Sequence, residues 1–522
     1  MTATRGLIAS ADGGAAEHAA AWRGALPIAG LAGLVLLAVV LRLVPTVFQP
    51  SMNWGDEIFQ TIEPAHRLVY GYGLVTWEFR VGMRSWLLPG AIAGLIEIAR
   101  VFGDGPRYYL PAIATALGLL AAAPVVCAYL WCRRECGLAG ALVAAAAVAV
   151  APELVYFGAR ALNGVVAAHI FVIALYLTAP GHPVGRRRQF AAGVLLGLAC
   201  LLRLQLAPAA ALVALWPGRG DWRARCLALV AGGAAALAGG AMLDWLTLGY
   251  PLASVWRNLY YNLYLGISSG FSVAPWWFYL AGELGVWLAA APFVALLIAF
   301  GARRLPLPLA AALVIVAVHS AIPHKEYRFI YPAIVLLMLL AASGLAQLTG
   351  AATQWLRRRG ARPAVAAALA AATLIALWGG AAAAAWSGGT LALLRQRAHD
   401  EFLAIADVRD LPGLCGVGLY GKNAWVRYGG YSRLHRRVPL FWPATAAELR
   451  ASAPGFDILL YDTTERVLPL DLGFRRLRCF GTICIARRAG RCAAAPPSPM
   501  WIPQALRGRR SAAPSTAGPR RR

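Results

Sequence analysis

Charged residues are scarce in this chain: Asp, Glu, Lys and Arg make up 14% of its 522 residues, whereas 60% are hydrophobic. Its apolar stretches repeatedly reach about 20 residues, the length that a helix needs to cross a lipid bilayer. This composition excludes an ordinary soluble globular protein of the same length. We therefore expect an all-α polytopic membrane protein.

Lysine is nearly absent, because only Lys325 and Lys422 stand among 49 basic residues. The net charge is +26, but the basic residues lie mainly in short loops between apolar stretches. That placement is typical of the charge that sets membrane orientation, and it argues against nucleic acid as a partner. In a chain with so strong an arginine bias, each lysine is a candidate for a specific role.

Patterns for metal binding and covalent catalysis are also missing. The nine cysteines show no metal-ligand spacing, and no Ser-His-Asp or Cys-His arrangement is evident, so we expect neither a metal centre nor a covalent nucleophile. Five cysteines fall in or near apolar stretches, where they would pack as small apolar groups: Cys127, Cys132, Cys136, Cys200 and Cys226. The other four lie in the tail, where a disulfide is left unassigned: Cys415, Cys479, Cys484 and Cys492.

Loop charge predicts how the chain crosses the membrane. After a cytoplasmic N-terminus (1–25), we expect about eleven transmembrane helices, near residues 26–46, 108–131, 138–156, 163–179, 189–202, 204–217, 224–248, 277–301, 306–322, 329–347 and 363–387. With this count the short arginine clusters all fall on the cytoplasmic side, as the positive-inside rule requires: 133–134, 186–188, Arg219 with Arg223 and Arg225, 303–304, and 357–359 with Arg362.

Two choices support that count. The apolar segment Ser85 to Phe102 is placed on the outer surface as an interfacial or re-entrant helix, because counting it as a span would move the arginine clusters outside. Residues 189–217 are split at Arg203 and Gln205 into two short half-spans. The loop 47–107, the segment 249–276 and the region after residue 387 then share the outer face.

The loop 47–107 carries acids, bases and aromatic residues at the membrane surface. It begins Asn53-Trp54-Gly55-Asp56-Glu57 and continues through His66, Gly71-Tyr72-Gly73 and Trp77-Glu78 to Arg84. Trp77 is equally well explained as an interfacial anchor, and an acid in an outer loop is often only solvated charge. Two adjacent acids, Asp56 and Glu57, are the more informative feature.

A second polar segment, Pro323 to Phe329, lies directly between two apolar stretches and contains His324-Lys325-Glu326-Tyr327-Arg328. Ionisable residues at such a depth are costly and mark substrate or ion paths. The plainer alternative is an interfacial loop whose lysine and arginine extend to the membrane surface.

Together these segments resemble the mannosyltransferases of glycosyltransferase family 22. The matching stretches are Asp56-Glu57 with Phe59-Gln60, Glu63 to Arg67, Gly71 to Glu78, Arg84-Ser85, and His324-Lys325-Glu326 with Arg328-Phe329. A weaker match, Tyr431-Ser432 followed by His435, lies in the tail. The chain departs from the family pattern at Trp54-Gly55, where His-Pro is usual, and at Tyr327, where an acid is usual.

The resemblance implies a GT-C fold with its active site in a cavity at the outer face, an aspartate from the first outer loop, and a polyprenyl-phosphate-sugar donor in place of a nucleotide sugar. We expect an inverting transfer with two catalytic residues: Asp56 as the base, and Glu57 as its neighbour or as a group that positions the acceptor. Fixed positive charge would hold the leaving lipid phosphate. The expected substrate-binding residues are His324, Lys325, Glu326, Arg328, Arg84, Arg160, Asn163, Arg203, Trp77, Glu78 and His66.

The region after residue 387 predicts a small extracytoplasmic α/β domain over 388–492. Residues 414–420, 438–442, 456–461 and 475–486 have strand character, with a helix near 444–453. From Ala493 to the end, Pro, Ala, Ser and Arg dominate, which is typical of a disordered basic tail (493–522).

These expectations amount to a bacterial inner- or plasma-membrane mannosyltransferase that transfers a sugar to a lipid-linked or cell-envelope glycan. No cofactor is implied apart from the lipid donor, and a divalent-metal requirement is left open. The alternatives are a GT-C enzyme for another sugar or a protein acceptor, a transporter or flippase, and a non-catalytic scaffold. A transporter would be expected to show internal repeats and midplane charges, and the sequence shows neither clearly.

Overall fold

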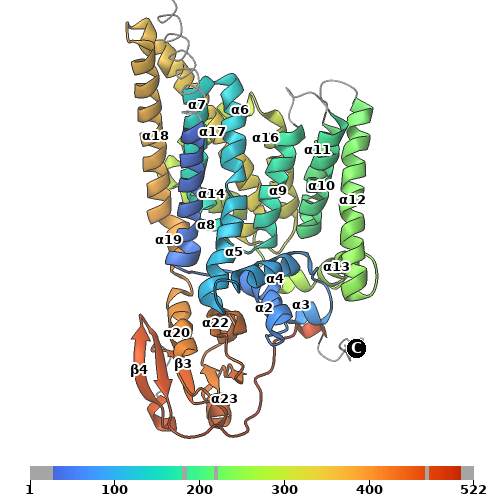
Figure 1. The fold of residues 1–522 in the computed structure, drawn as a ribbon, viewed down its shortest axis with the longest axis vertical. Helices are drawn as coiled ribbons and strands as arrows, with labels where there is room; N and C mark the ends of the chain where they lie inside the picture. Colours follow the sequence, from blue (N-terminus) through green and yellow to red (C-terminus); the bar gives the residue numbers. More distant parts are fainter. Residues whose placement is uncertain (1–27, 179–184, 217–221, 465–468, 507–522) are drawn as a thin grey trace, which may run out of the picture.

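The computed structural model describes residues 28–178, 185–216, 222–464 and 469–506. A bundle of apolar helices carries a small α/β domain at one end (Figure 1). The expectations for residues 1–25, for Arg219 and for the chain beyond residue 506 lie outside the described residues.

Within the described ranges, six helices are long and apolar enough to cross a membrane: Ile28–Phe48, Pro106–Glu135, Trp222–Leu248 (α12), Phe278–Ala302, Tyr327–Arg358 and Pro363–Ser387 (α18). Three of these are composite and contain α5 (Pro106–Leu120) with α6 (Ala123–Glu135), α14 (Phe278–Trp287) with α15 (Ala291–Ala302), and α17 (Tyr331–Arg358). Shorter helices complete the bundle: α7 (Gly137–Val150), α8 (Pro152–Phe157), α9 (Asn163–Thr178), α10 (Arg186–Leu202), α11 (Ala207–Leu215) and α16 (Pro306–Ala321).

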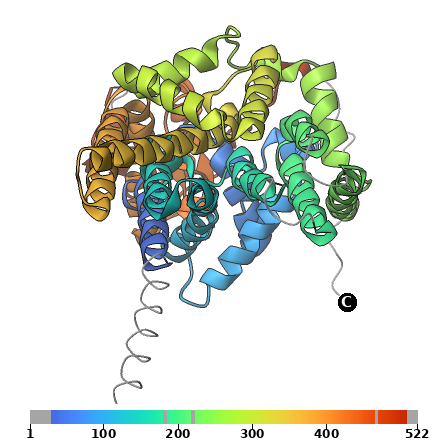
Figure 2. The ribbon, with the colours of Figure 1, turned by 90° about the horizontal axis from the view of Figure 1, so that it is seen from above.

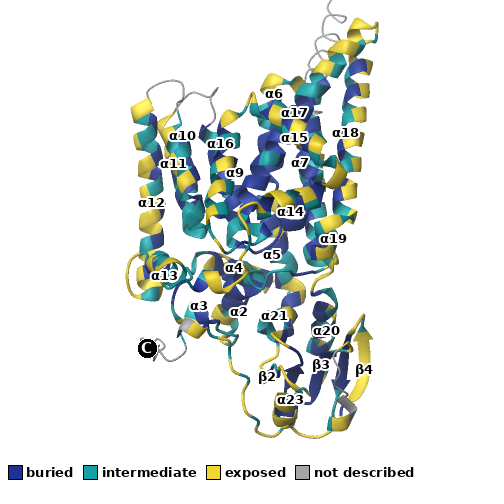
Figure 3. Cartoon of the chain, turned by 180° about the vertical axis from the view of Figure 1, so that it is seen from behind, coloured by how far each residue is buried: buried dark blue, intermediate teal, exposed yellow. Residues whose placement is uncertain are grey.

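Every one of the eleven predicted spans coincides with a helix of this bundle. Helix α17 forms its centre, since 89% of its apolar window is buried, whereas α12 and α18 lie at the periphery with 22% and 17% buried (Figures 2 and 3). The outer side chains of α12 include Leu227 and Leu246, which are 70% and 77% exposed. A surface of large apolar residues is typical of contact with lipid, so the chain is an integral membrane protein. How many of the eleven helices cross the membrane stays a prediction.

Both segments have the local form that the two topological choices predict, and the side of the membrane that they face stays a prediction. The segment placed on the outer surface forms α4 (Leu87–Ala99), whose 13 residues span about 20 Å and lie across the end of the bundle (Figure 1). The stretch 189–217 is divided into α10 and α11, with Arg203 extended between them and a single 3-10 turn, η3 (Leu204–Leu206), following it. At the opposite end from α4, Arg304 lies 3.9 Å from Glu135, which brings two of the expected cytoplasmic loops together.

The end of the bundle beside the α/β domain is closed by short elements from the loop 47–107 and the segment 249–276. They are η2 (Ile58–Ile62), α2 (Glu63–Tyr70), α3 (Trp77–Arg80), α13 (Ala253–Leu259), η4 (Tyr260–Tyr264) and η5 (Ile267–Gly270). Three further short elements belong to long helices of the bundle: η1 (Val44–Phe48) ends the first one, η6 (Leu288–Ala290) joins α14 to α15, and η7 (Tyr327–Ile330) leads into α17. The polar segments that the sequence singled out therefore lie at one end of the molecule.

The tail folds into a five-stranded mixed sheet in the order β2-β1-β3-β5-β4. Its strands are β1 (Val417–Leu419), β2 (Leu440–Phe441), β3 (Ile458–Asp462), β4 (Arg475–Phe480) and β5 (Ile483–Arg487). Helix α19 (Gly389–Gln396) still packs on the bundle, where Leu391 and Leu394 join its core. The helices that follow are α20 (His399–Asp410), α21 (Ala424–Tyr428), α22 (Tyr431–Leu434) and α23 (Ala446–Ser452), with 3-10 turns η8 (Ala453–Gly455), η9 (Pro469–Leu472) and η10 (Gln504–Leu506).

Alternation along β3 explains the two-sided core of this domain. Ile458 and Leu460 pack with Ile405 of α20 on one face, whereas Leu459 packs with Leu449 of α23 on the other. The sheet thus has a helix on each face, and the predicted α/β character is present.

The predicted single strand 475–486 is wrong: it is the hairpin β4–β5, turned at Gly481 and Thr482. Gly481 has φ of 51°, a conformation that glycine adopts at little cost. Cys479 and Cys484 face each other across this hairpin and are disulfide-bonded. A second disulfide joins Cys415 to Cys492 across 77 residues.

The segment 493–506 differs from the expected disorder. It runs as an extended strap along the domain, where Ala493 N donates to Pro454 O (2.8 Å) and the Ser498 hydroxyl accepts from Trp442 N (2.8 Å). Trp501 then reaches the outer loop, with its ring 6.4 Å from that of Trp77. The strap has a defined path because its hydrogen-bond partners, Pro454 and Trp442, belong to the folded domain.

Candidate active site

Asp56 lies on the turn that leads into η2, and it forms an ion pair with Arg328 of η7. The two residues are 272 positions apart in the sequence. The Asp56 side chain is 35% exposed, which makes it the most open carboxylate among those of its immediate neighbourhood, since Glu57 and Glu78 are 12% and 14% exposed. The structure therefore joins the two predicted motifs through the residue expected to be the base.

Positive charge surrounds Asp56 on several sides. Burial on its own would raise the pKa of this carboxyl, but the charges of Arg328, Arg84 and Arg203 outweigh burial and hold the pKa below its ordinary value. Asp56 is therefore ionised at neutral pH and ready to accept a proton.

Arg328 is held by more than Asp56. Its Nε donates to Glu326 Oε2 (2.6 Å), and its guanidinium lies 5.8 Å from the ring centre of Trp54 and 5.0 Å from that of Phe329. Glu326 in turn lies 3.5 Å from His324 Nε2. This planar cation is bound by two carboxylates and lies near two rings, so it presents a fixed charge to the site.

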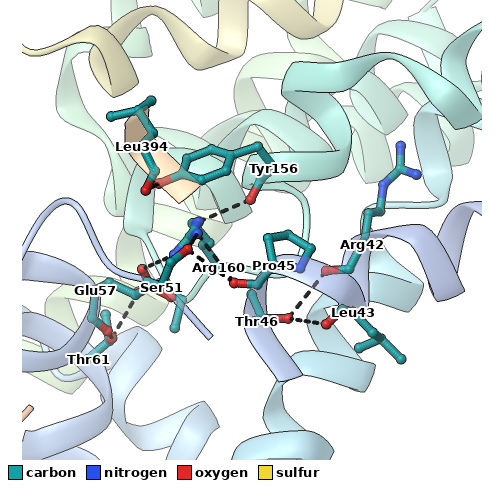
Figure 4. Close-up of polar contacts among 11 residues, drawn as sticks. Arg42, Leu43, Pro45, Thr46, Ser51, Glu57, Thr61, Tyr156, Arg160 and Leu394 are labelled. Atoms are coloured by element: carbon teal, nitrogen blue, oxygen red, sulfur yellow. Dashed lines mark hydrogen bonds and ion pairs between the residues drawn. The ribbon is translucent and has the colours of Figure 1, made fainter. Parts of the chain in front are cut away.

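Glu57 has a different environment from its neighbour. Its carboxylate accepts from Arg160 Nη1 (2.9 Å), and Arg160 is fully buried. The same guanidinium donates to Ser51 O (2.7 Å) and Ser51 Oγ (2.9 Å) and lies 4.1 Å from the ring centre of Tyr156 (Figure 4). Glu57 and Arg160 thus fix the start of the outer loop on the helix bundle.

Glu78 and Arg84 form a second ion pair of the loop, and Gln60 Nε2 lies 3.2 Å from both oxygens of Glu78. Burial raises the pKa of Glu78 despite the charge of Arg84. Trp77 is buried beside them, against Tyr261 and Trp501. This position agrees with a packing role for Trp77 as well as with substrate contact.

The segment His324 to Arg328 is positioned by the loop before α14. Lys325 N donates to Ser272 O (3.0 Å), and His324 pairs with Val273 as an isolated β-bridge. Lys325 as a whole is 4% exposed, and its Nζ donates to Ile322 O (2.5 Å). The lysine therefore turns back onto the backbone here, whereas Arg328 faces Asp56.

Arg203 and Asn163 approach the same end from the bundle. The Arg203 guanidinium lies 4.3 Å from the ring centre of Phe329 and 3.3 Å from His319 Nε2. Asn163 opens α9, and a Cβ at the next residue, Gly164, would lie 3.8 Å from Arg203. The split between α10 and α11 thus brings a basic apex to the site.

His66 belongs to a separate group. Its Nε2 lies 3.2 Å from His435 Nδ1, and its ring is enclosed by Tyr70, Tyr72 and Tyr109. Burial, together with the charge of His435, lowers the pKa of His66 to about 4. The predicted substrate-binding residue is therefore neutral and lies where the α/β domain docks, not beside Asp56.

Glu63 is the centre of that docking. This fully buried carboxylate accepts hydrogen bonds from the backbone N–H groups of Leu74 (2.8 Å), Tyr431 (3.1 Å) and Ser432 (2.7 Å). The outer loop and the Tyr431-Ser432 element, which the sequence linked only by resemblance, are thus bonded to each other.

Two residues of the site were not predicted as such. Trp54 lies beneath Arg328 and stacks on Phe157 at 5.6 Å, and Gln60 binds Glu78. Gln60 stands four residues after Asp56, a spacing that places both on one face of a helix and was the available signal. For Trp54 the available signal was its place directly before the Asp56-Glu57 pair, where the family usually has His-Pro.

Residues 34–391 match the model of the Alg9-like mannosyltransferase family. The chain belongs to that family. Among curated members, GPI mannosyltransferase 3 of Yarrowia lipolytica is 30% identical over 326 residues, which cover 60% of this chain and 61% of that protein. Mannosyltransferase APTG1 of Arabidopsis thaliana is 26% identical, over 60% of this chain and 58% of its own length. The chain thus spans about three fifths of the length of these Alg9-like relatives.

Solved structures show the GT-C fold. The crystal structure of ArnT from Cupriavidus metallidurans bound to undecaprenyl phosphate has a TM-score of 0.57 at 13% identity, over 89% of this chain and 98% of that one. At such low identity the likeness concerns the fold alone. It covers more of the chain than the family match over residues 34–391 does.

Proposed function

We propose that this chain is an inverting mannosyltransferase that moves mannose from a polyprenyl-phosphate donor to a lipid-linked or cell-envelope glycan. The reaction would take place at the end of the bundle that carries the α/β domain, which we assign to the outer face of a bacterial inner or plasma membrane. No resident cofactor is required in this proposal, since the lipid donor is a cosubstrate.

The ion pair between Asp56 and Arg328 carries this proposal. It places a partly exposed, ionised carboxylate against a rigid cation at the end of an apolar bundle. Transfer from a sugar phosphate needs both groups: a base for the acceptor hydroxyl and a fixed positive charge for the phosphate that leaves. A purely structural ion pair would not need its acid open to solvent.

The chemistry is a single displacement at the anomeric carbon. The acceptor oxygen forms the new glycosidic bond while the bond from that carbon to the phosphate oxygen breaks, and the phosphate leaves with the electron pair. Asp56 takes the proton of the acceptor hydroxyl. Arg328, with Arg203 and Arg84 nearby, stabilises the phosphate dianion, and Glu57 holds the loop through Arg160.

The names of the relatives support the choice of sugar, because several are GPI mannosyltransferases. ArnT, which shares the fold, is solved with undecaprenyl phosphate, and this supports a polyprenyl phosphate as the donor lipid. The sugar, linkage and acceptor remain parts of the proposal.

The test compares two adjacent variants, Asp56→Asn and Glu57→Gln, in membranes with matched protein abundance. We expect Asp56→Asn to lower transfer of labelled mannose from polyprenyl-phosphate-mannose by about 100-fold or more, the usual contribution of a general base. Glu57→Gln keeps a hydrogen-bond acceptor for Arg160, so transfer per folded molecule should fall much less.

Equal losses in both variants would show that the pair acts through the loop structure and would remove Asp56 from its role as base. Transfer unchanged in Asp56→Asn would do the same. Absence of transfer by the wild type, with labelled glucose or arabinose donors transferred instead, would overturn mannose as the sugar.

A further inference from the structure

A cavity of about 550 Å³ lies between the outer loop and the α/β domain, apart from the Asp56 cluster. Its walls come from residues 67–80 on one side and residues 431–442 on the other, and residues 498–500 of the strap border it. We refer to this cavity as the interdomain cleft. Glu63 bonds these two walls to each other through the backbone N–H groups of Leu74, Tyr431 and Ser432.

Three arginines line the interdomain cleft: Arg67, Arg80 and Arg437. All three are exposed residues, and none forms an ion pair with a carboxylate among the residues that the structure describes. Arg80 Nε donates to Val75 O (3.1 Å), which directs this side chain along the loop. Several guanidinium groups without counter-charge around one cavity form a site for an anion.

Aromatic rings line the same cavity. Tyr72 and Tyr431 meet edge to face at 5.5 Å, and the Tyr431 hydroxyl donates to Val438 O (2.9 Å). Trp442 Nε1 donates to Pro499 O (3.2 Å), so the strap and this ring hold each other. Rigid rings with an apolar face and a polar edge suit a ligand that is itself apolar on one face and hydroxylated at its rim, as a sugar ring is.

The interdomain cleft and the Asp56 cluster share the single turn of α3. Glu78 of this turn pairs with Arg84 in the cluster, and Arg80, two residues later, lines the cleft. Two residues apart on a helix are about 200° apart around its axis, so α3 separates the two sites by about the thickness of one helix, 10–12 Å. A chain of two or three sugars would extend over such a distance.

The strap adds a second link. After Ser498 and Met500 at the cleft, Trp501 contacts Trp77 and also lies 5.7 Å from Phe271, whose ring is 5.7 Å from that of His324. The wall of the cleft thus continues to the segment that carries Arg328.

We propose that the interdomain cleft binds an anionic saccharide portion of the acceptor, a sugar that carries a phosphate or carboxylate group, while a neighbouring hydroxyl reaches Asp56. This inference rests on the proposed transferase function and names the acceptor class. A membrane surface of anionic lipid fits less well, because the three arginines border one cavity between two folded parts instead of a flat face.

Binding is measured on the purified 522-residue chain with Asp56→Asn, which separates binding from turnover. The probes are mannose 6-phosphate, mannose and inorganic phosphate, followed by tryptophan fluorescence, since Trp442 lines the cleft. We expect Arg67→Ala with Arg437→Ala to weaken mannose 6-phosphate about tenfold, a loss typical of a charge-assisted contact. The control pair, Arg475→Ala with Arg476→Ala, removes two exposed arginines from β4 and should leave binding unchanged.

Arg328→Gln serves as a second control. If mannose 6-phosphate binds at the reaction centre, its affinity should fall in Arg328→Gln and stay the same when Arg67 and Arg437 are replaced. The proposal would be overturned if the cleft variant (Arg67→Ala with Arg437→Ala) and the β4 variant weakened binding of mannose 6-phosphate equally. It would also be overturned if the cleft variant bound mannose 6-phosphate as tightly as the protein without these changes. Mannose bound as tightly as its phosphate would refute the anionic part, and phosphate bound as tightly as the sugar phosphate would refute the saccharide part. Loss of binding to phosphatidylserine vesicles alone would identify a lipid surface instead.

The two proposals fail in different ways. A chain that binds mannose 6-phosphate at the cleft but transfers no sugar would overturn the transferase function alone. A chain that transfers mannose with an acceptor KM unchanged in the cleft variant would overturn the cleft alone.

Discussion

Asp56 and Glu57 are neighbours in the chain, yet their surroundings give them different roles. Glu57 forms an ion pair with Arg160, which is fully buried. Loss of this pair would leave a buried cation without its partner and would destabilise the fold. Asp56 keeps a third of its side chain open and faces arginines that favour its ionised form. Two adjacent residues therefore have different roles: Glu57 anchors the loop, and Asp56 is the reactive acid.

The pH dependence of transfer should reveal the link between Asp56 and Arg328. The base must be ionised, and the arginines hold its pKa below the usual 3.8, so transfer should persist to low pH. Arg328→Gln removes the strongest of these charges, and the acidic limb of the rate profile should move upward by about one pH unit or more. Lys325→Gln is the matched control, because Lys325 binds Ile322 O and should not shift this limb.

The same shift affects stability. Because the pKa of Asp56 is lower in the folded protein, the ionised carboxylate stabilises the fold at pH values above the unfolded pKa of 3.8. This contribution is lost as the pH falls through the lower pKa of the folded protein.

The rate profile also has an outcome that would contradict this assignment. If the acidic limb of the profile lay at the same pH in the wild type and in Arg328→Gln, Asp56 would not be the titrating base.

Among the helices, close packing depends on glycines at particular points. A Cβ at Gly193 of α10 would lie 2.0 Å from Leu229 O of α12, and a Cβ at Gly232 would lie 2.0 Å from Phe190 O. The two helices therefore touch backbone to backbone, as small residues permit in membrane bundles. This contact positions the hairpin whose apex is Arg203.

Gly193→Ala should consequently force α10 away from α12 and lower the free energy of unfolding by about 1–3 kcal/mol, the usual cost of overpacking. Gly239→Ala, on the outer side of α12 with nothing within 4 Å, should be neutral or slightly stabilising. Thermal unfolding in detergent, with the yield of folded protein, measures both. Equal effects in the two variants would contradict this packing.

For the whole molecule, the cysteines of the α/β domain indicate which compartment the candidate site faces. Its two disulfides, Cys415–Cys492 and Cys479–Cys484, persist in oxidising compartments, whereas Cys127 and Cys132 are buried as free thiols in the bundle. This distribution agrees with the proposed outward orientation.

Alkylation of the chain from intact cells checks this orientation. The four tail cysteines should resist alkylation under denaturing conditions until a reductant is added, whereas Cys127 and Cys132 should react without it. Replacing Cys415 and Cys492 by Ser should destabilise the domain by about 4 kcal/mol, because the bridge closes a loop of 77 residues. Tail cysteines that react without reductant would place this domain, and the candidate site, in a reducing compartment.

Much of the fold was predictable because its signals are local. Apolar stretches and arginine clusters marked every helix of the bundle, and they also marked α4 as a surface helix and Arg203 as an apex. The family followed from the two polar motifs, and the Alg9-like match confirms it. The two errors have different causes: the hairpin β4–β5 was taken for one strand because its turn at Gly481 and Thr482 is short, and the strap was taken for disorder because its partners are distant in the sequence.

The sequence by itself determined a membrane bundle, its family and the set of residues from which an active site could be built, because composition, periodicity and motif order are properties of the chain alone. Only the tertiary structure decided which of these residues meet at the candidate site and which have other partners. It paired Asp56 with Arg328, assigned Glu57 to Arg160, turned Lys325 toward a carbonyl and placed His66 at the domain interface. These outcomes depend on which distant groups share a buried volume, and burial and charge, not sequence order, then set the chemistry of each residue.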